Sequence, residues 1–177
     1  ALKIADAGLE AIDTEKAMVS AVRIHDNILH VKDKEFDLNN FKRIKVVGFG
    51  KVSCGAAVAL EKIFGEKLTS GAVIDVVAGK CEFIEHFVGT HPRPSLQNVE
   101  ATKHIMDLSS GVTEEDLVVV IVSGGGSSLL CYPESECGQS AKLYDKFLPT
   151  GATIQELNLV RKHLSFLKGG GWAKLFY

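Results

Sequence analysis

The feature that most constrains the fold is a run of aliphatic residues that ends in three consecutive glycines. Residues 117–122 read LVVVIV, and SGGGSS follows at 123–128. An aliphatic run without alternating polar residues is typical of a strand buried on both faces, as in a parallel sheet covered by helices. Because glycine ends the run abruptly, we expect the chain to leave the sheet there in a loop at the carboxyl end of the strand.

The rest of the chain repeats this succession of strand, loop and helix. In order we expect two helices within 1–24, a hairpin of 27–32 and 35–38, a strand at 43–50, a helix at 53–64, a strand at 71–77, a helix at 96–110, the strand at 115–123 and a helix at 154–167. Strands that alternate with helices predict the α/β class. The expected architecture has three layers, with a Rossmann-like, mostly parallel sheet and helices on both faces.

Helix caps support these boundaries. Asp13 fits an N-cap between the first two helices, and Ser95 fits the cap of the helix that follows THPRPS. Thr153 and Glu156 have the spacing of a capping box. The segment between Ser128 and Thr153 is rich in Pro, Glu, Ser and Gly, and we expect it to be looser.

Composition and charge exclude several classes of protein. The 177 residues, 46% of them hydrophobic, suffice for one domain with a sizeable core. The formal net charge is −2 and the basic residues are scattered, so we expect no nucleic-acid or membrane partner. No apolar run reaches the roughly 18 residues of a membrane helix. Acidic residues within the first sixteen positions do not fit a secretory signal, so we expect a cytoplasmic protein.

The four cysteines indicate neither a metal site nor a redox motif. They form no CxxC pair and share no histidine at zinc-finger spacing. In a cytoplasmic protein we expect reduced thiols. Cys54 belongs to a helix rich in glycine and alanine, and we expect its side chain to serve packing alone.

A first glycine loop, VVGFGKVSCG, follows the strand at 43–50. It is not a Walker loop, because its first two glycines are one residue apart and valine follows its lysine. It approaches the dinucleotide fingerprint GxGxxG, but Ser53 occupies the third glycine position and Asp75 lies inside a strand pattern. Lys51 could meet a phosphoryl oxygen as charge develops there. The alternative is a solvated lysine on an ordinary turn.

The second glycine loop, Ser123 to Ser128, predicts an anion site. Successive glycines can adopt the conformations that point several N–H groups at one place, and the serine hydroxyls add donors. The string SGGGSS does not fit the GxSxG pattern of a nucleophile elbow. A plain turn that allows close packing of helix on strand stays an alternative.

The helix at 154–167 presents two contrasting arcs. The polar arc contains Asn158, Arg161, Lys162 and Ser165, and the apolar arc contains Leu157, Val160, Leu164 and Leu167. A solvated helix face is the plain explanation of the polar arc. His91 and His163 could act as acid, base or ligand, but no second histidine or acid at metal spacing accompanies either.

Taken together, the motifs resemble the class of glycerate kinases that form 2-phosphoglycerate, a family also described under the older label of hydroxypyruvate reductase. The matching strings, in order, are ALKIADAGLEAID, VVGFGKVSCGAA, GTHPRPS, EEDLVVVIVSGGGSSLL and LPTGATIQELNLVRKHLSFLKGG. They span nearly the whole chain. The family pattern usually has a small residue where Phe49 stands, valine where Arg93 stands, and KGGxLA where this chain has KGGGWAK.

This resemblance implies an ATP- and Mg²⁺-dependent transfer of the γ-phosphoryl group to the 2-hydroxyl of D-glycerate, in a cleft between two α/β domains. It implies that Lys51 is catalytic. The implied substrate- and phosphate-binding residues are Ser123, Gly124, Gly125, Gly126, Ser127, Ser128, Asn158, Arg161, Lys162, His163 and His91. It identifies no metal ligand in this chain.

The resemblance covers only the N-terminal part of that family. We therefore expect residues 1–177 to be an incomplete N-terminal domain of a two-domain kinase, without the rest of that domain and without the C-terminal domain. The chain alone would then lack groups that the reaction needs. Whether the protein forms a homo-oligomer is left open. One alternative is an NAD(P)-dependent hydroxypyruvate reductase that uses Gly48 and Gly50 on a pyrophosphate and Asp75 on a ribose. The other is a non-catalytic α/β remnant that only binds.

Overall fold

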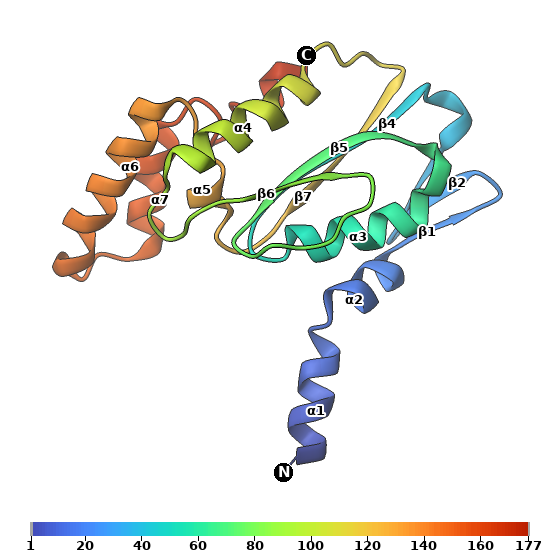
Figure 1. The fold of residues 1–177 in the computed structure, drawn as a ribbon, viewed down its shortest axis with the longest axis horizontal. Coiled ribbons are helices and arrows are strands. Elements are labelled where there is room, and N and C mark those ends of the chain that lie inside the picture. The colour runs from blue at the N-terminus through green and yellow to red at the C-terminus, as the bar shows by residue number, and fades with distance from the viewer. Residues whose placement is uncertain (1, 177) are drawn as a thin grey trace.

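The computed structural model describes residues 2–176 of the chain. The elements are α1 (Leu2–Ala11), α2 (Thr14–Ala21), β1 (Val22–His25), β2 (Ile28–Val31), β3 (Lys34–Asp37), β4 (Arg43–Phe49), α3 (Ser53–Phe64), β5 (Leu68–Asp75), β6 (Glu85–Val88), α4 (Leu96–Ser109), β7 (Asp116–Val122), α5 (Gly126–Leu129), α6 (Glu134–Phe147) and α7 (Ile154–Leu164). Short 3₁₀ turns lie at Leu38–Asn40, Gly65–Lys67, Leu148–Thr150 and Ala173–Phe176. Helix α1 projects away from the rest of the molecule (Figure 1).

The centre of the fold is a four-stranded sheet in the order β6-β5-β4-β7, and every pair in it is parallel. Strand β4 lies between β5 and β7, with its residues 44–48 fully buried. At the carboxyl end of β4, Gly48 is level with Val73 of β5 and Ile121 of β7. A side chain at position 48 would collide with Ile121, so glycine permits this close register.

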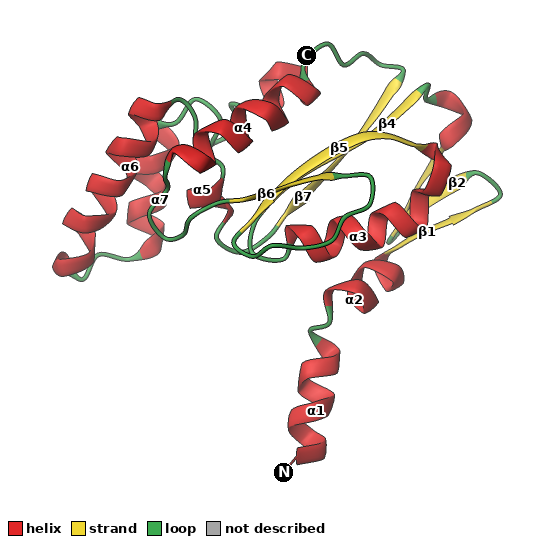
Figure 2. Cartoon of the chain, in the orientation of Figure 1, coloured by secondary structure: helices red, strands yellow, loops and turns green. Residues whose placement is uncertain are grey.

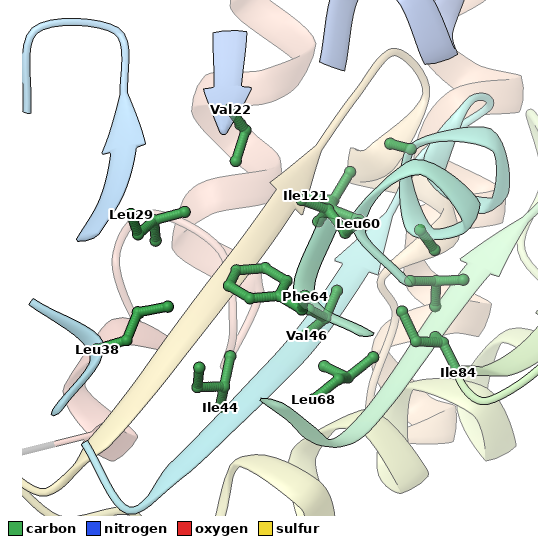
Figure 3. Close-up of a cluster of buried hydrophobic side chains, with 13 residues drawn as sticks. Val22, Leu29, Leu38, Ile44, Val46, Leu60, Phe64, Leu68, Ile84 and Ile121 are labelled. Carbon is green, nitrogen blue, oxygen red and sulfur yellow. The ribbon is translucent and has the colours of Figure 1, made fainter. Parts of the chain in front are cut away.

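Helices cover both faces of the sheet, which confirms the predicted three-layer α/β class (Figure 2). Helix α3 packs on one face, where Leu60 and Phe64 join Val46 of β4 in a buried cluster (Figure 3). The small antiparallel sheet β1-β2-β3 closes the same cluster through Val22 and Leu29. Helix α4 covers the other face.

On that second face the core contains residues from distant parts of the chain. Ile105 of α4 packs with Ile74 of β5, Leu129 of α5 and Trp172 near the C-terminal end. Helices α5, α6 and α7 lie together beside one end of the sheet (Figure 1). Residues 123–125 of the predicted glycine loop precede α5, and Gly126 to Ser128 lie inside that helix, so the glycine segment is anchored between the sheet and this group of helices.

Several predicted boundaries are confirmed. Helix α3 has the expected bounds, Asp13 accepts a hydrogen bond from the N–H of Lys16 at 2.8 Å, and Thr153 and Glu156 form the capping box of α7. The prediction of helix up to residue 24 was wrong. Residues 22–25 form β1 because each pairs with a residue of β2, so tertiary pairing overrides the helical spacing.

The segment expected to be loose contains a long helix. Helix α6 spans Glu134–Phe147 and buries Glu136, Cys137 and Ser140, which are polar or small residues. A helix whose buried side is this polar gives little hydrophobic periodicity, so the pattern did not reveal it. Strand β6 was likewise missed, because its sequence EHFV does not alternate apolar and polar residues.

The aliphatic run 117–122 is a strand, but it forms an edge of the sheet among the residues described. It pairs with β4 alone, and the side chains of Val120 and Val122 are 40% and 68% exposed. The prediction that both faces of this strand are covered was therefore wrong for residues 2–176.

The cysteines differ from expectation in one respect. Cys131 and Cys137 are joined in a disulfide, six residues apart, whereas reduced thiols were expected. The two cysteines are close because α6 begins three residues after Cys131 and carries Cys137 in its first turn. Cys54 is free and buried, as predicted, and its Sγ lies 3.6 Å from that of Cys81. Within residues 2–176, no helix combines the length and the apolar character that a membrane span requires.

A bidentate ion pair fixes the first residue of β7 to the first residue of β4. Arg43 donates to both carboxylate oxygens of Asp116, at 2.5 and 2.6 Å. This pairing and the N–H of Thr113 lower the pKa of Asp116 to about 2, against the opposing effect of burial. The Asp116 side chain is almost completely buried, whereas Arg43 stays partly exposed.

We predict that Asp116→Asn lowers the free energy of unfolding near pH 6 and reduces its dependence on acid pH. Because the pKa of Asp116 is lower in the folded state, its contribution is present above the unfolded pKa of about 3.9 and is lost as the pH falls toward about 2. Urea unfolding at several pH values between about 6 and 3 measures this. The exposed Asp107→Asn variant is the control, and identical pH profiles for wild type and Asp116→Asn would contradict the prediction.

Candidate functional site

Two glycine loops meet at the carboxyl ends of β4 and β7. The N–H of Ser123 donates to the carbonyl of Phe49 at 3.1 Å, and the N–H of Lys51 donates to the carbonyl of Gly124 at 2.9 Å. Gly50 has φ +129°, and a side chain there would collide with Ser123. The two loops predicted separately from the sequence therefore form one contiguous surface.

Lys51 and His91 come together over Gly125. A Cβ atom at position 125 would lie 2.9 Å from the His91 ring and 3.0 Å from Cε of Lys51. Gly125 also has φ +81°, in the left-handed region that favours glycine. The structure thus places the catalytic candidate of the first loop and the histidine of GTHPRPS against the centre of the second loop.

The second loop offers unused backbone donors. In the hydrogen bonds found between residues 2–176, the N–H groups of Gly124, Gly125 and Ser127 have no acceptor, whereas that of Gly126 donates to the carbonyl of Ser123. All three unused donors lie within four consecutive residues next to the Lys51 side chain. Such a set of N–H groups is the arrangement of an anion-binding nest.

Arg161 of α7 reaches this loop from the other side. Its guanidinium donates to Oγ of Ser127 at 3.4 Å, and the residue is only 4% exposed. Arg161 is buried on the same side of α7 as Leu157, while Leu164 is 46% exposed. The predicted division of α7 into a polar and an apolar arc was therefore wrong, because one cation lies on the buried face.

The four polar candidates of α7 separate into two pairs. Arg161 and Asn158 lie inward, and Oδ1 of Asn158 is buried without a hydrogen-bond partner among the described residues. Lys162 and His163 are exposed. His163 Nδ1 contacts the carbonyl of Leu159 in its own helix at 2.8 Å, and Lys162 packs beside Gly169. Of these four residues, Arg161 is the one that forms a hydrogen bond to the glycine loop.

The electrostatics of the site are cationic. The pKa of His91 is lowered, first by burial and then by the positive charges of Lys51 and Arg161. Burial likewise lowers the pKa of Arg161. Because a lowered pKa favours the uncharged ring, His91 is neutral at pH 7, and the two permanent cations dominate the local field.

Asp75 caps the start of α3 beside the two glycine loops. It is 1% exposed, and its carboxylate accepts from the N–H of Cys54 at 3.0 Å and from its own neighbour Val76 at 2.6 Å. It thereby satisfies a donor in the first turn of α3. Ser123 Oγ also accepts from the N–H of Val52 at 3.3 Å. A carboxylate engaged in this way is not available to a ribose hydroxyl.

Sequence reasoning missed Asn98, whose side chain holds the end of the second loop through hydrogen bonds. Its Oδ1 accepts from Thr90 and Ser95, and its Nδ2 donates to the carbonyls of Ser128 and Leu129 at 3.2 and 3.3 Å. Asn98 thus ties the loop that carries His91 to the end of the glycine loop. The only sequence signal was its position three residues after the expected N-cap Ser95, the spacing of a capping box.

Two departures from the family pattern contact each other. The ring of Phe49 lies 5.7 Å from that of Trp172, and a Cβ at Gly126 would come within 2.5 Å of Phe49. The third departure, Arg93, forms an ion pair with Asp145 at 2.6 Å. Each unusual residue therefore has a packing or charge partner in this chain.

We predict that Asn98→Ala lowers the free energy of unfolding by about 2–4 kcal/mol. The substitution leaves buried carbonyl and N–H groups of two loops without partners, which costs more than the loss of one exposed hydrogen bond. Urea unfolding monitored by circular dichroism measures the change. Gln97→Ala, an exposed neighbour in the same helix, serves as control, and a loss below about 1 kcal/mol for Asn98→Ala would refute the organising role.

We also predict that Lys51→Met raises the pKa of the His91 imidazole. Removing the nearby ammonium removes one of the charges that disfavour protonation of the ring. The pKa is measured by NMR titration, with His91→Gln to assign the signal. Lys103→Met, on the exposed side of α4, should leave the pKa unchanged. If Lys51→Met has no effect either, the two side chains do not meet in solution.

The chain was compared with known protein families, sequences and solved structures. The family described as a domain of unknown function, DUF4147, matches residues 1–177. The glycerate 2-kinase of Pyrococcus horikoshii is 33% identical over 177 residues, which are 98% of this chain and 40% of that protein. Among solved structures, the PH0495 protein of the same organism has a TM-score of 0.86 at 30% identity, over 98% of this chain and 40% of that one.

A second solved structure, the glycerate kinase of Thermotoga maritima, has a TM-score of 0.78 at 28% identity and covers 99% of this chain and 40% of that one. The chain therefore spans about 40% of the length of these relatives. The family model matches the full length of the chain, and the chain therefore belongs to the DUF4147 family.

Proposed function

We propose that this chain is the N-terminal part of a D-glycerate 2-kinase, which transfers the γ-phosphoryl group of ATP to the 2-hydroxyl of D-glycerate. The names of the relatives support this assignment, since they include a glycerate 2-kinase and a glycerate kinase. The observation that carries it is the convergence of Lys51, His91 and Arg161 on a glycine loop with unused N–H groups.

The chemistry of phosphoryl transfer fits this set of groups. The transfer passes through a state in which negative charge is spread over the equatorial oxygens, so that positioning and positive charge supply most of the catalysis. We assign the N–H groups of the loop to phosphate oxygens and Lys51 to the charge that develops during transfer. The neutral His91 ring can accept a hydrogen bond from a hydroxyl group at the same place.

ATP as donor and Mg²⁺ as its metal remain part of this proposal. The residues described include no group of three His, Cys, Asp or Glu side chains that could hold a metal ion. The side chains that converge on the loop are cations and hydroxyls, which do not fit a cage for Mg²⁺. We therefore assign no metal ligand to this chain and derive no step through the metal.

The hydroxypyruvate reductase alternative is not favoured. It requires Asp75 on a ribose, yet this carboxylate is buried and accepts from the N–H groups of Cys54 and Val76. The first glycine loop also lies closely against Ser123, which fills the space that a pyrophosphate would need above Gly50. NADH oxidation by hydroxypyruvate, with no ADP release from glycerate, would restore this alternative.

The proposal includes the domain organisation. The free edge of β7, with exposed Val120 and Val122, is where further parallel strands of the first domain would add. A second domain would then face the glycine loops and complete the cleft. We place the whole protein in the cytoplasm and leave its oligomeric state open. A non-catalytic remnant would keep the loops but release no ADP in any assembly.

We predict that Lys51→Ala in the complete protein lowers turnover with D-glycerate by at least about 100-fold, the scale of a removed electrostatic stabiliser. A coupled ADP-release assay with a panel of small 2-hydroxy acids measures it. Lys103→Ala is the matched control, because that lysine is exposed on α4 away from the loops. Wild-type turnover in Lys51→Ala would remove the residue from the catalytic set.

A further inference from the structure

Two free cysteines lie in contact with each other outside the second glycine loop. Cys54 belongs to the first turn of α3, and Cys81 belongs to the loop of residues 76–84 that joins β5 to β6. They are 27 positions apart in the chain, yet their Sγ atoms are 3.6 Å apart. The spacing of the cysteines in the sequence contains no sign of this pair. The fold therefore creates a dithiol from two distant segments.

Cys54 is held by its own helix and covered by the loop. The residue is 4% exposed, and its N–H donates to the carboxylate of Asp75 at 3.0 Å. Gly79 of the loop lies directly against its sulfur, since a side chain at position 79 would collide with Sγ of Cys54. Because Cys54 is fixed in this way, any change in the distance between the two sulfurs has to come from the loop.

Cys81 is positioned by hydrogen bonds on either side of it in the chain. Glu61 of α3 accepts from the N–H groups of residues 82–84 at 2.5 to 3.0 Å, and His86 Nδ1 accepts from the N–H of Gly79 at 3.2 Å. Cys81 itself is partly exposed and packs on the buried cluster beneath α3. Because these hydrogen bonds end on side chains, the loop can shift toward Cys54 without breaking a strand pairing.

The distance between the sulfurs is close to that of a covalent bond. A disulfide requires sulfurs about 2.0 Å apart, so Cys81 has to approach Cys54 by roughly 1.6 Å. Two thiols held in contact combine readily once one of them is oxidised, because that reaction is intramolecular. Burial raises the pKa of both thiols, that of Cys81 to about 12, so both are protonated at pH 7. Proximity thus favours the bond, while burial slows its formation.

We propose that Cys54 and Cys81 form a reversible redox site, which hydrogen peroxide oxidises to a disulfide that fastens the loop of residues 76–84 to the start of α3. The more exposed Cys81 reacts first: its sulfur bonds to one peroxide oxygen, the O–O bond breaks, and the thiol proton leaves with the other oxygen as water. The sulfur of Cys54 then attacks that of the Cys81 sulfenic acid. The S–O bond breaks, and its hydroxyl leaves with the Cys54 proton as a second water. The two sulfurs lose two electrons, which reduce the two peroxide oxygens.

The disulfide would fix the geometry beside the first glycine loop. Lys51 and Cys54 at the start of α3 line a recess of about 390 Å³ together with Gly79 and Lys80 of the β5–β6 loop. A bond between Cys54 and Cys81 would hold these two walls of the recess at a constant separation. The redox site does not depend on the proposed kinase activity, since it needs only the two thiols and an oxidant.

Peptide mapping of the complete protein without reduction tests the site directly. After incubation with hydrogen peroxide, we expect the peptides of Cys54 and Cys81 to be linked with the loss of two hydrogen atoms, and a thiol reductant to separate them. The oxidised protein should melt about 2 °C or more above the untreated protein, because a disulfide constrains the unfolded chain. Cys81→Ser, which keeps Cys131 and Cys137, is the control and should show neither change.

The order of the two steps is tested in Cys54→Ala, which removes the second thiol. Dimedone, which traps sulfenic acids, should label Cys81 in this variant after treatment with peroxide. The wild type should stay unlabelled at Cys81, because Cys54 consumes the sulfenic acid. Equal labelling of Cys81 in both proteins would show that the two sulfurs do not meet in solution.

The redox site is also refuted by any of three results of the mapping and melting experiments. These are the absence of a linked peptide in oxidised wild type, a link from Cys81 to Cys131 or Cys137 instead, and a linked protein that melts no higher than Cys81→Ser treated in the same way. Each readout is independent of ADP release. A protein that releases no ADP from glycerate but forms the link would keep the redox site and refute the kinase, and an active kinase without the link would do the reverse.

Discussion

The site depends on the parallel pairing of β4 with β7. These strands run in register from Arg43 and Asp116 to Phe49 and Val122, so both glycine loops begin at the same height. The ion pair of Arg43 with Asp116 holds one end of the pair, and the contact of Gly50 with Ser123 holds the other. Two loops that are more than 70 residues apart in the chain thereby act as one surface. Any larger side chain at position 50 would separate them.

Around this pair of strands, several buried polar and aromatic side chains hold the loops in position. Asn98 ties the loop of His91 to the end of α5, and Asp75 accepts a hydrogen bond from the first turn of α3. Phe49 fills the space above Gly126 and packs on Trp172. These groups hold the loops in a fixed position, with the unused N–H groups next to the side chains of Lys51 and Arg161. Preorganisation of this kind lets fixed donors act without rearrangement during a reaction.

Much of this could be predicted from local sequence, because strands, helix caps and glycine loops are local patterns. The class, the bounds of α3, the cap at Asp13 and the glycine turn that leaves β7 at residues 123–125 follow from residues near one another in the chain. The burial of Arg161 could not be predicted, since it depends on α6, a helix with almost no hydrophobic period. The position of β7 at an edge also depends on partners outside its own sequence. Long-range packing, not propensity, decided these features.

The charge balance indicates what the surface formed by the two glycine loops can bind. Lys51 and Arg161 are two cations on either side of a loop whose free N–H groups add further positive potential, and no described carboxylate neutralises them. Positive groups without a counter-charge nearby repel one another, so such a surface favours bound anions. A phosphoryl group matches the converging N–H groups, while a planar carboxylate matches the guanidinium. In the proposed kinase, positive charge on both sides of the loop would reduce the repulsion between two bound anions, which otherwise opposes transfer from one to the other.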